Sequence, residues 1–152
     1  MKPQELIGKE IAEIRCEISR FDYEGSIPLE EIDVEMKLST GEIISFPHHP
    51  EAHKIECGKF NPKLKKIFPQ NGISKFLNKP NGFEKLINQK IIGIWIADDD
   101  FGEEICLLEF QNGCFLTKGP MSPIGTGNAD LFLFESKNKV KDRYEEDIKK
   151  VI

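Results

Sequence analysis

The residues of this chain best suited to metal chemistry lie together in the segment SFPHHPEAHKIECG. This segment contains all three histidines of the protein and one of its four cysteines: His48, His49, His53 and Cys57. Pro50 suits the first position of a helix, and Gly58 suits the position after its end. A helix between them would place His49, His53 and Cys57 on one face, four residues apart. Because neutral imidazole and thiolate are zinc ligands, the segment is a candidate metal site.

Two features of the same segment argue against a metal. Three ligands on one short helix surround a tetrahedral ion poorly. The HExxH pattern of metalloproteases, with its glutamate between the histidines, is also missing. The alternative is a surface helix with ordinary histidines, which change charge at about pH 6.5. We therefore expect no metal and no cofactor, and keep His49, His53 and Cys57 as the candidate ligands.

The loop DDDFGEE holds a second group of chemically active side chains. Its five acids are Asp98, Asp99, Asp100, Glu103 and Glu104. A calcium loop of EF-hand type needs glycine at its sixth position, but counting from Asp98 that position holds Glu103, and Gly102 comes one place early. Two catalytic carboxylates are one interpretation of the loop. We favour a solvated or partner-facing loop.

No motif in the chain indicates a specific reaction. The glycine-rich stretch GTGN precedes an expected strand, whereas a phosphate-binding loop precedes a helix. No serine lies in a nucleophile-elbow pattern, and no cysteine–histidine pair is favoured by its spacing. We therefore predict a protein that is not an enzyme. The alternatives are a metal-dependent hydrolase that uses His48, His49, His53 and the acidic loop, or a module that binds a small ligand.

Composition narrows the choice of partners. The chain has 152 residues, which suits one domain with a buried core, and its net charge of −5 favours a basic partner over nucleic acid. Residues 59–85 carry seven lysines with interleaved phenylalanines and so resemble a nucleic-acid patch, yet they include no arginine. We interpret this segment as a linker that its phenylalanines hold against the core.

Sequence signals also bear on location. The N-terminal segment lacks the apolar stretch of a signal peptide, and no apolar run reaches membrane-spanning length. The four cysteines show no CxxC pairing and are best interpreted as free thiols in a reducing compartment. We therefore expect a cytoplasmic protein without membrane contact.

The two halves of the chain carry a common pattern. At an offset of 80, PQELIGKEIAEIRC aligns with FEKLINQKIIGIWI, and at an offset of 72, VEMKLSTGEIISF aligns with CLLEFQNGCFLTK. Each copy is expected to begin with a short helical turn that ends at Gly8 or Asn88, the residue types that best tolerate a left-handed backbone. A strand follows, and then a hairpin whose tight turn is Thr40–Gly41 or Asn112–Gly113.

The alternation of apolar and polar residues predicts which strand faces are buried. In the first copy, Ala12 and Ile14 share an apolar face with Cys16 and Ile18, and charged residues occupy the other face, as in a sheet with one wet face. In the second copy the strands are apolar on both faces, so we expect them to be covered on both sides or to use one face for a partner. Trp95 fits either a core position or a partner contact.

These patterns define the predicted fold class, which is α+β. We expect a β-rich single domain, residues 1–152, built from two tandem, pseudo-symmetric helix–strand–hairpin units with a C-terminal helix. Unit one spans about 3–50 and unit two about 83–135, with the lysine-rich connector at about 59–82. The C-terminal helix is expected at about 137–151, capped by Ser136. Its apolar stripe would be Val140, Tyr144, Ile148 and Val151.

The style of the chain, from LIGKEIAEI to GTGNADLFLF, resembles the small acidic immunity proteins of bacterial polymorphic-toxin and contact-dependent growth inhibition systems. The resemblance implies a cytosolic inhibitor that binds one cognate toxin domain, often a basic nuclease, and blocks it. Acidic loops would suit such a partner, because carboxylates can occupy a site made for phosphates. The predicted partner-binding residues are Asp98, Asp99, Asp100, Glu103, Glu104, Asp22, Glu24, Glu30, Glu31 and Trp95. The sequence also allows a homodimer formed through an exposed strand edge.

Overall fold

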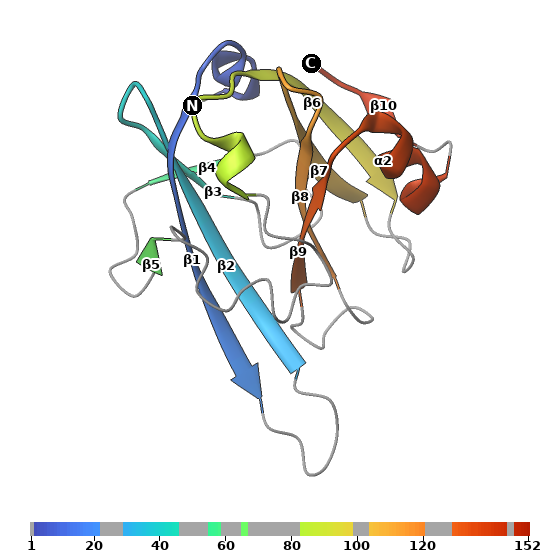
Figure 1. The fold of residues 1–152 in the computed structure, drawn as a ribbon, viewed down its shortest axis with the longest axis horizontal. Helices are drawn as coiled ribbons and strands as arrows, with labels where there is room; N and C mark the ends of the chain where they lie inside the picture. The colour runs from blue at the N-terminus through green and yellow to red at the C-terminus, as the bar shows by residue number, and fades with distance from the viewer. Residues whose placement is uncertain are drawn as a thin grey trace.

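The computed structural model describes residues 2–21, 29–45, 55–58, 65–66, 83–98, 104–120, 129–145 and 148–152. These residues form a β-rich fold with two antiparallel sheets and an α-helix near the C-terminal end (Figure 1). Among them, no helix is both long and apolar enough to cross a membrane.

The first sheet follows a short 3-10 helix, η1 (Pro3–Leu6). Its strands are β1 (Ile11–Phe21), β2 (Leu29–Leu38), β3 (Ile43–Ser45), β4 (Glu56–Gly58) and β5 (Lys65–Lys66). They lie in the order β4-β3-β2-β1-β5. The fifth strand lies within the predicted connector, where the sequence pattern indicated no strand, and it pairs with β1 at Arg15 and Cys16.

The second sheet follows a second 3-10 helix, η2 (Phe83–Leu86). Its strands are β6 (Ile91–Asp98), β7 (Glu104–Phe110), β8 (Phe115–Pro120), β9 (Ala129–Phe134) and β10 (Lys149–Lys150), and the helix α2 (Lys137–Tyr144) lies between the last two along the chain. The order is β10-β6-β7-β8-β9. Read from its β9 end, this sheet has the same order of successive strands as the first sheet.

The predicted turns are confirmed. Gly8 and Asn88, which follow η1 and η2, have φ angles of +86° and +62°. The tight turns before β3 and β8 contain Gly41 and Gly113, with φ angles of +99° and +86°. Glycine is favoured at such positions because the left-handed region lacks the steric cost that a Cβ would add.

Backbone hydrogen bonds join the beginnings of the two sheets. Gly8 N donates to Ile91 O and Asn88 N donates to Ile11 O, both at 2.8 Å. Ile11 N donates to Gln89 O at 3.2 Å and Ile91 N donates to Lys9 O at 2.9 Å. Between these bonds, Glu10 and Lys90 form an antiparallel bridge. Each bond has a counterpart with residue numbers shifted by 80 and the two halves exchanged.

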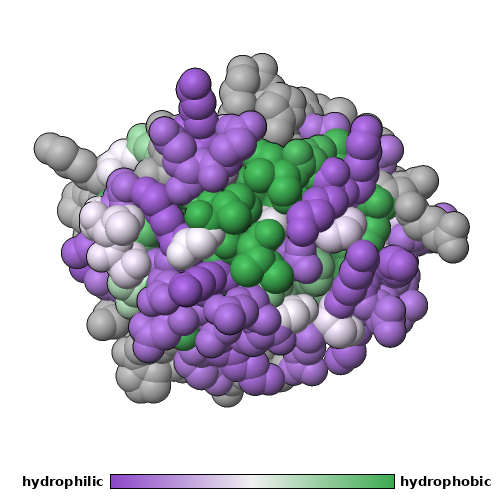
Figure 2. Space-filling model, turned by 90° about the horizontal axis from the view of Figure 1, so that it is seen from above, coloured by the Kyte–Doolittle hydropathy of each residue, from purple (hydrophilic) through white to green (hydrophobic). Residues whose placement is uncertain are grey.

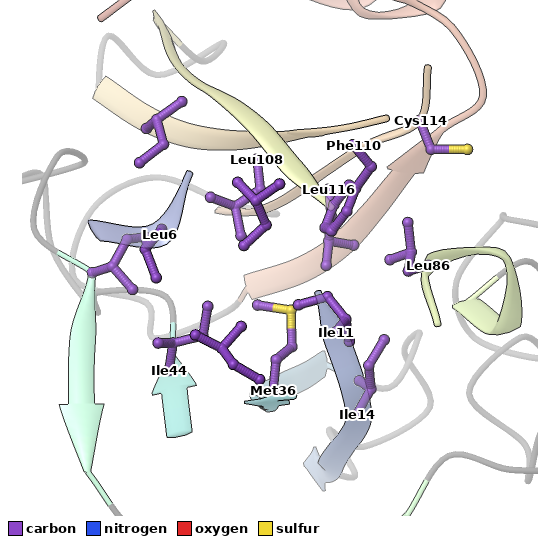
Figure 3. Packing of buried hydrophobic residues seen from close by; sticks show 14 of the residues in the cluster. Leu6, Ile11, Ile14, Met36, Ile44, Leu86, Leu108, Phe110, Cys114 and Leu116 are labelled. Carbon is purple, nitrogen blue, oxygen red and sulfur yellow. The ribbon is translucent and has the colours of Figure 1, made fainter. Parts of the chain in front are cut away.

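A hydrophobic core lies between the sheets (Figure 3). Both sheets contribute fully buried side chains, such as Ile14 and Met36 from the first sheet and Leu108 and Leu116 from the second. A second cluster lies on the other face of the second sheet, where Val140 and Tyr144 of α2 cover it; it consists of Trp95, Ala97, Ile105, Leu107, Phe115, Phe134, Val140 and Tyr144. The prediction that the second copy is covered on both faces is therefore confirmed.

The exposed face of the first sheet carries charge, as predicted. Glu13 and Glu35 are half-buried there, and Lys37 is exposed. This sheet therefore contributes one apolar face to the core, whereas the second sheet contributes two.

The predicted strict alternation of faces is wrong at the start of both long strands. Ile11 and Ile14 are both buried while Ala12 is exposed, because the register of β1 against β2 shifts between Ile11 and Glu13. The second sheet has the same irregularity between Ile91 and Gly93, which leaves Ile92 40% exposed. A bulge adds one residue to one strand and so reverses the phase of the alternation that follows it.

The C-terminal helix is shorter than predicted. Ser136 caps it, with its Oγ accepting a hydrogen bond from Lys139 N, but the helix ends at Tyr144 and Glu145 has a φ angle of +57°. The chain then extends into β10, which pairs with β6. An exposed strand edge has unpaired backbone groups, and pairing with β6 satisfies them in a way that a longer helix could not.

Candidate protein-binding surface at the end of the second sheet

The acidic loop begins and ends at two carboxylates that face each other. Asp98 of β6 and Glu104 of β7 are directly paired and close the hairpin. Asp98 is exposed and Glu104 is half-buried. Like charges directly opposite each other in an antiparallel pair are unfavourable. The other acids of the loop, Asp99, Asp100 and Glu103, lie outside the described residues.

In the corresponding hairpin of the first sheet, the acids are paired with residues of other types. Glu30 and Glu31 of β2 pair with Arg20 and Ser19 of β1, so one of the two acids has a basic residue opposite it. The described hairpin ends at the pair Phe21 and Leu29. The remaining predicted contacts of this copy, Asp22 and Glu24, lie outside the described residues.

The described ends of the two hairpins lie apart. The β1–β2 hairpin ends at the bottom of Figure 1, whereas β6 ends at the right, beside α2. The two sites can be changed separately by mutation.

The structure places Trp95 in the cluster under α2. The residue is only 9% exposed, and its ring meets Phe115 edge-on with centroids 6.0 Å apart. Its Nε1–H donates a hydrogen bond of 2.6 Å to Glu109 Oε2. Lys137 Nζ and Lys150 Nζ lie 4.4 and 5.7 Å from the ring centroid. Of the two interpretations that the sequence allowed, these contacts correspond to a core position whose polar edge is satisfied within the chain.

The sequence pattern did not indicate which side chain accepts the hydrogen bond from Trp95. Glu109 of β7 also lies 3.5 Å from Lys150 Nζ, and its side chain is 17% exposed. Gly93 makes room for it, because a Cβ at that position would come within 2.5 Å of Glu109 Oε2. A glycine inside an otherwise apolar strand is the sequence signal that could have indicated this close approach.

The structure does not support Cys57 as part of the predicted helical metal site. Cys57 is exposed and lies in β4, opposite Ile44 of β3, so the predicted helix does not extend to it. Residues four apart are separated by about 6 Å along a helix but by about 13 Å along a strand, so the predicted helical grouping does not hold for Cys57. His48, His49 and His53 lie outside the described residues. Within the described ranges, no three histidine, cysteine or acidic side chains are grouped as metal ligands.

Two further thiols are buried and free. Burial raises the pKa of Cys106 to about 12, and the nearby charge of Glu104 contributes in the same direction. Burial also raises the pKa of Cys114, against the opposing effect of Lys85. Because the thiolate is the nucleophile, the raised pKa values disfavour the reactive form of both cysteines.

Two charged clusters connect segments at the surface. Glu42 accepts hydrogen bonds from Lys9 Nζ and from Thr40 Oγ1, and these hold the pKa of its exposed carboxyl at about 2. Lys85 Nζ lies 3.1 Å from Glu135 Oε1, a contact that raises the pKa of the lysine and lowers that of the glutamate. Both clusters join segments distant in sequence at the surface.

No family model, curated protein or solved structure matches this chain. The structure itself describes a β-rich protein of two antiparallel sheets and a short helix, with an acidic hairpin end.

Proposed function

We propose that the protein is a non-enzymatic binding protein of the immunity class, which neutralises a cognate toxin domain of basic charge. The observation that carries the proposal is the direct pairing of Asp98 with Glu104 at the neck of a loop with three more acids. Carboxylates placed directly opposite each other concentrate negative charge at this end of the sheet. A cationic partner would be attracted by several of these carboxylates at once.

The support beneath this hairpin end suits recognition. Ala97 and Ile105, next to the acidic pair, are 2% and 5% exposed and belong to the cluster under α2. Strands buried on both faces hold the backbone at Asp98 and Glu104 in place before a partner arrives. Preorganisation of this kind reduces the entropy lost on binding.

We further infer that the protein consists of two pseudo-symmetric tandem units. Three observations support this inference: the sheets have the same order of successive strands, the exchanged hydrogen bonds occur at an offset of 80, and bulges follow both Ile11 and Ile91. The two sheets differ in that α2 lies between β9 and β10 along the chain, whereas no described helix lies between β4 and β5. On this view α2 is an addition specific to unit two.

A growth-protection experiment tests the proposed function. A toxin gene adjacent to the gene for this protein would be expressed alone, with the wild-type chain, and with the variant Asp98→Lys/Glu104→Lys. We expect the wild-type chain to protect growth and the variant to protect poorly, with slower association at low salt. Retained association in the variant would remove this hairpin from the interface. Loss of toxicity without any complex formation would instead point to an enzymatic activity.

A matched variant controls for charge reversal as such. Glu5→Lys/Glu84→Lys makes the same net change at two exposed positions in η1 and η2, which precede the first strand of each sheet. We expect this variant to protect growth like the wild-type chain, apart from a small loss of long-range attraction that salt removes.

A further inference from the structure

An exposed apolar patch lies where the two sheets begin. Three large apolar side chains of the described residues are exposed, Ile7 and Val151 at 39% and Ile92 at 40%, whereas most others are buried. Ala12, the residue 80 positions before Ile92, is also exposed, and Ile87, the residue 80 positions after Ile7, is half-buried. The hydrogen bond from Gly8 N to Ile91 O brings Ile7 and Ile92 into neighbouring segments.

Figure 2 shows this side of the molecule from above Figure 1. Hydrophobic atoms gather at the centre of the face, and hydrophilic atoms surround them. An apolar centre with a polar rim is the usual anatomy of a protein–protein interface. The branched side chains of the patch also stand on hydrogen-bonded backbone, so little conformational entropy would be lost when they are covered.

The charges beside the patch indicate its occupant. Glu10 and Lys90 are paired directly across the antiparallel bridge between the two sheets. Within the described part of the chain, neither side chain forms an ion pair. When two copies face each other across a twofold axis, Glu10 of one copy can lie opposite Lys90 of the other. It offers no net attraction to the basic toxin expected at the acidic hairpin.

We propose that the patch docks a second copy of this chain, forming a twofold dimer. Ile7 and Ile92 of one copy cover the same residues of the other, and Glu10 of each copy pairs with Lys90 of its partner. Isologous interfaces repeat every contact in this way, so two ion pairs form for each pair of residues. This dimer does not depend on the proposed function, because the patch and the acidic hairpin use different segments.

A charge-swap series tests the proposal. The molar mass of the full chain would be measured by sedimentation equilibrium from low to high micromolar concentration. We expect a concentration-dependent dimer for the wild-type chain. Lys90→Glu and Glu10→Lys should each raise the Kd of the dimer by about tenfold or more, because each creates like-charge contacts across the interface. The double variant Glu10→Lys/Lys90→Glu should restore the wild-type Kd.

Two further variants make the result specific. Lys141→Glu, an exposed position on α2, makes the same charge change away from the patch and should leave the Kd unchanged. Ile92→Ser should abolish the dimer without lowering the melting temperature appreciably, since Ile92 is already 40% exposed. A wild-type chain that stays monomeric at every concentration overturns the proposal. A double variant that binds no better than the single variants overturns the pairing of Glu10 with Lys90.

Discussion

Replacement of Gly93 by alanine probes the contact on which the outer face of the second sheet depends. The backbone at Gly93 has no positive φ and lies within β6, so alanine fits the conformation. The obstacle is space: the added Cβ would lie 2.5 Å from Glu109 Oε2 and 3.0 Å from Lys150 Cε. Glu109 must therefore move, which breaks its 2.6 Å hydrogen bond from Trp95 Nε1.

The expected cost follows from the interactions lost. A hydrogen bond to a charged group contributes roughly 1.5–3 kcal/mol. Alanine offsets roughly 0.5–1 kcal/mol of this, because glycine loses more backbone entropy on folding. We therefore expect Gly93→Ala to lower the free energy of unfolding by about 1–2 kcal/mol, which corresponds to a fall in Tm of about 2–8 °C.

Urea denaturation followed by tryptophan fluorescence measures this change, because Trp95 is the only tryptophan of the chain. Gly58→Ala is the matched control, since nothing lies within 4 Å of a Cβ at that strand position. We expect the control to keep or raise the free energy of unfolding, by up to roughly 1 kcal/mol, because the entropic effect of alanine acts there without a clash. The alanine at Gly93 should also cost less in a Glu109→Ala background, where no carboxylate has to move. An equal cost in both backgrounds would refute the reasoning.

Three other properties can be measured directly. The carboxyl of Glu42 has a pKa of about 2 in the folded chain against 4.5 without its contacts. Its stabilising effect is therefore complete above about pH 4.5 and is lost as the pH falls towards 2. In acid unfolding curves, Glu42→Gln should lose less stability than the wild-type chain over that interval. Under native conditions a thiol reagent should label Cys57 and spare Cys106 and Cys114, which peptide mapping after labelling would check; rapid labelling of either buried thiol would contradict the packing found here. Addition of zinc or EDTA should leave the Tm unchanged in a thermal melt, and an increase with zinc would revive the candidate site at His49, His53 and Cys57.

Features that depend on neighbouring residues could be predicted from the sequence. The helical turns ended by Gly8 and Asn88 and the hairpin turns at Gly41 and Gly113 follow from the backbone conformations that these residue types tolerate. The burial of both faces of the second sheet followed from runs of apolar residues in its strands. The serine cap of α2 likewise depends on contacts within one turn.

Features that depend on distant partners could be found only in the tertiary structure. Two pairs of lysines form β5 and β10 because β1 and β6 offer them unpaired edges, and nothing in a Lys–Lys pair by itself favours a strand. The bulges that expose Ala12 and Ile92 depend on the register against β2 and β7. Local sequence therefore determined where the chain turns and which strands are apolar. Pairing between segments far apart decided where each strand edge, each exposed side chain and the contacts of Trp95 lie. The reason is that a backbone hydrogen bond depends on both of its partners.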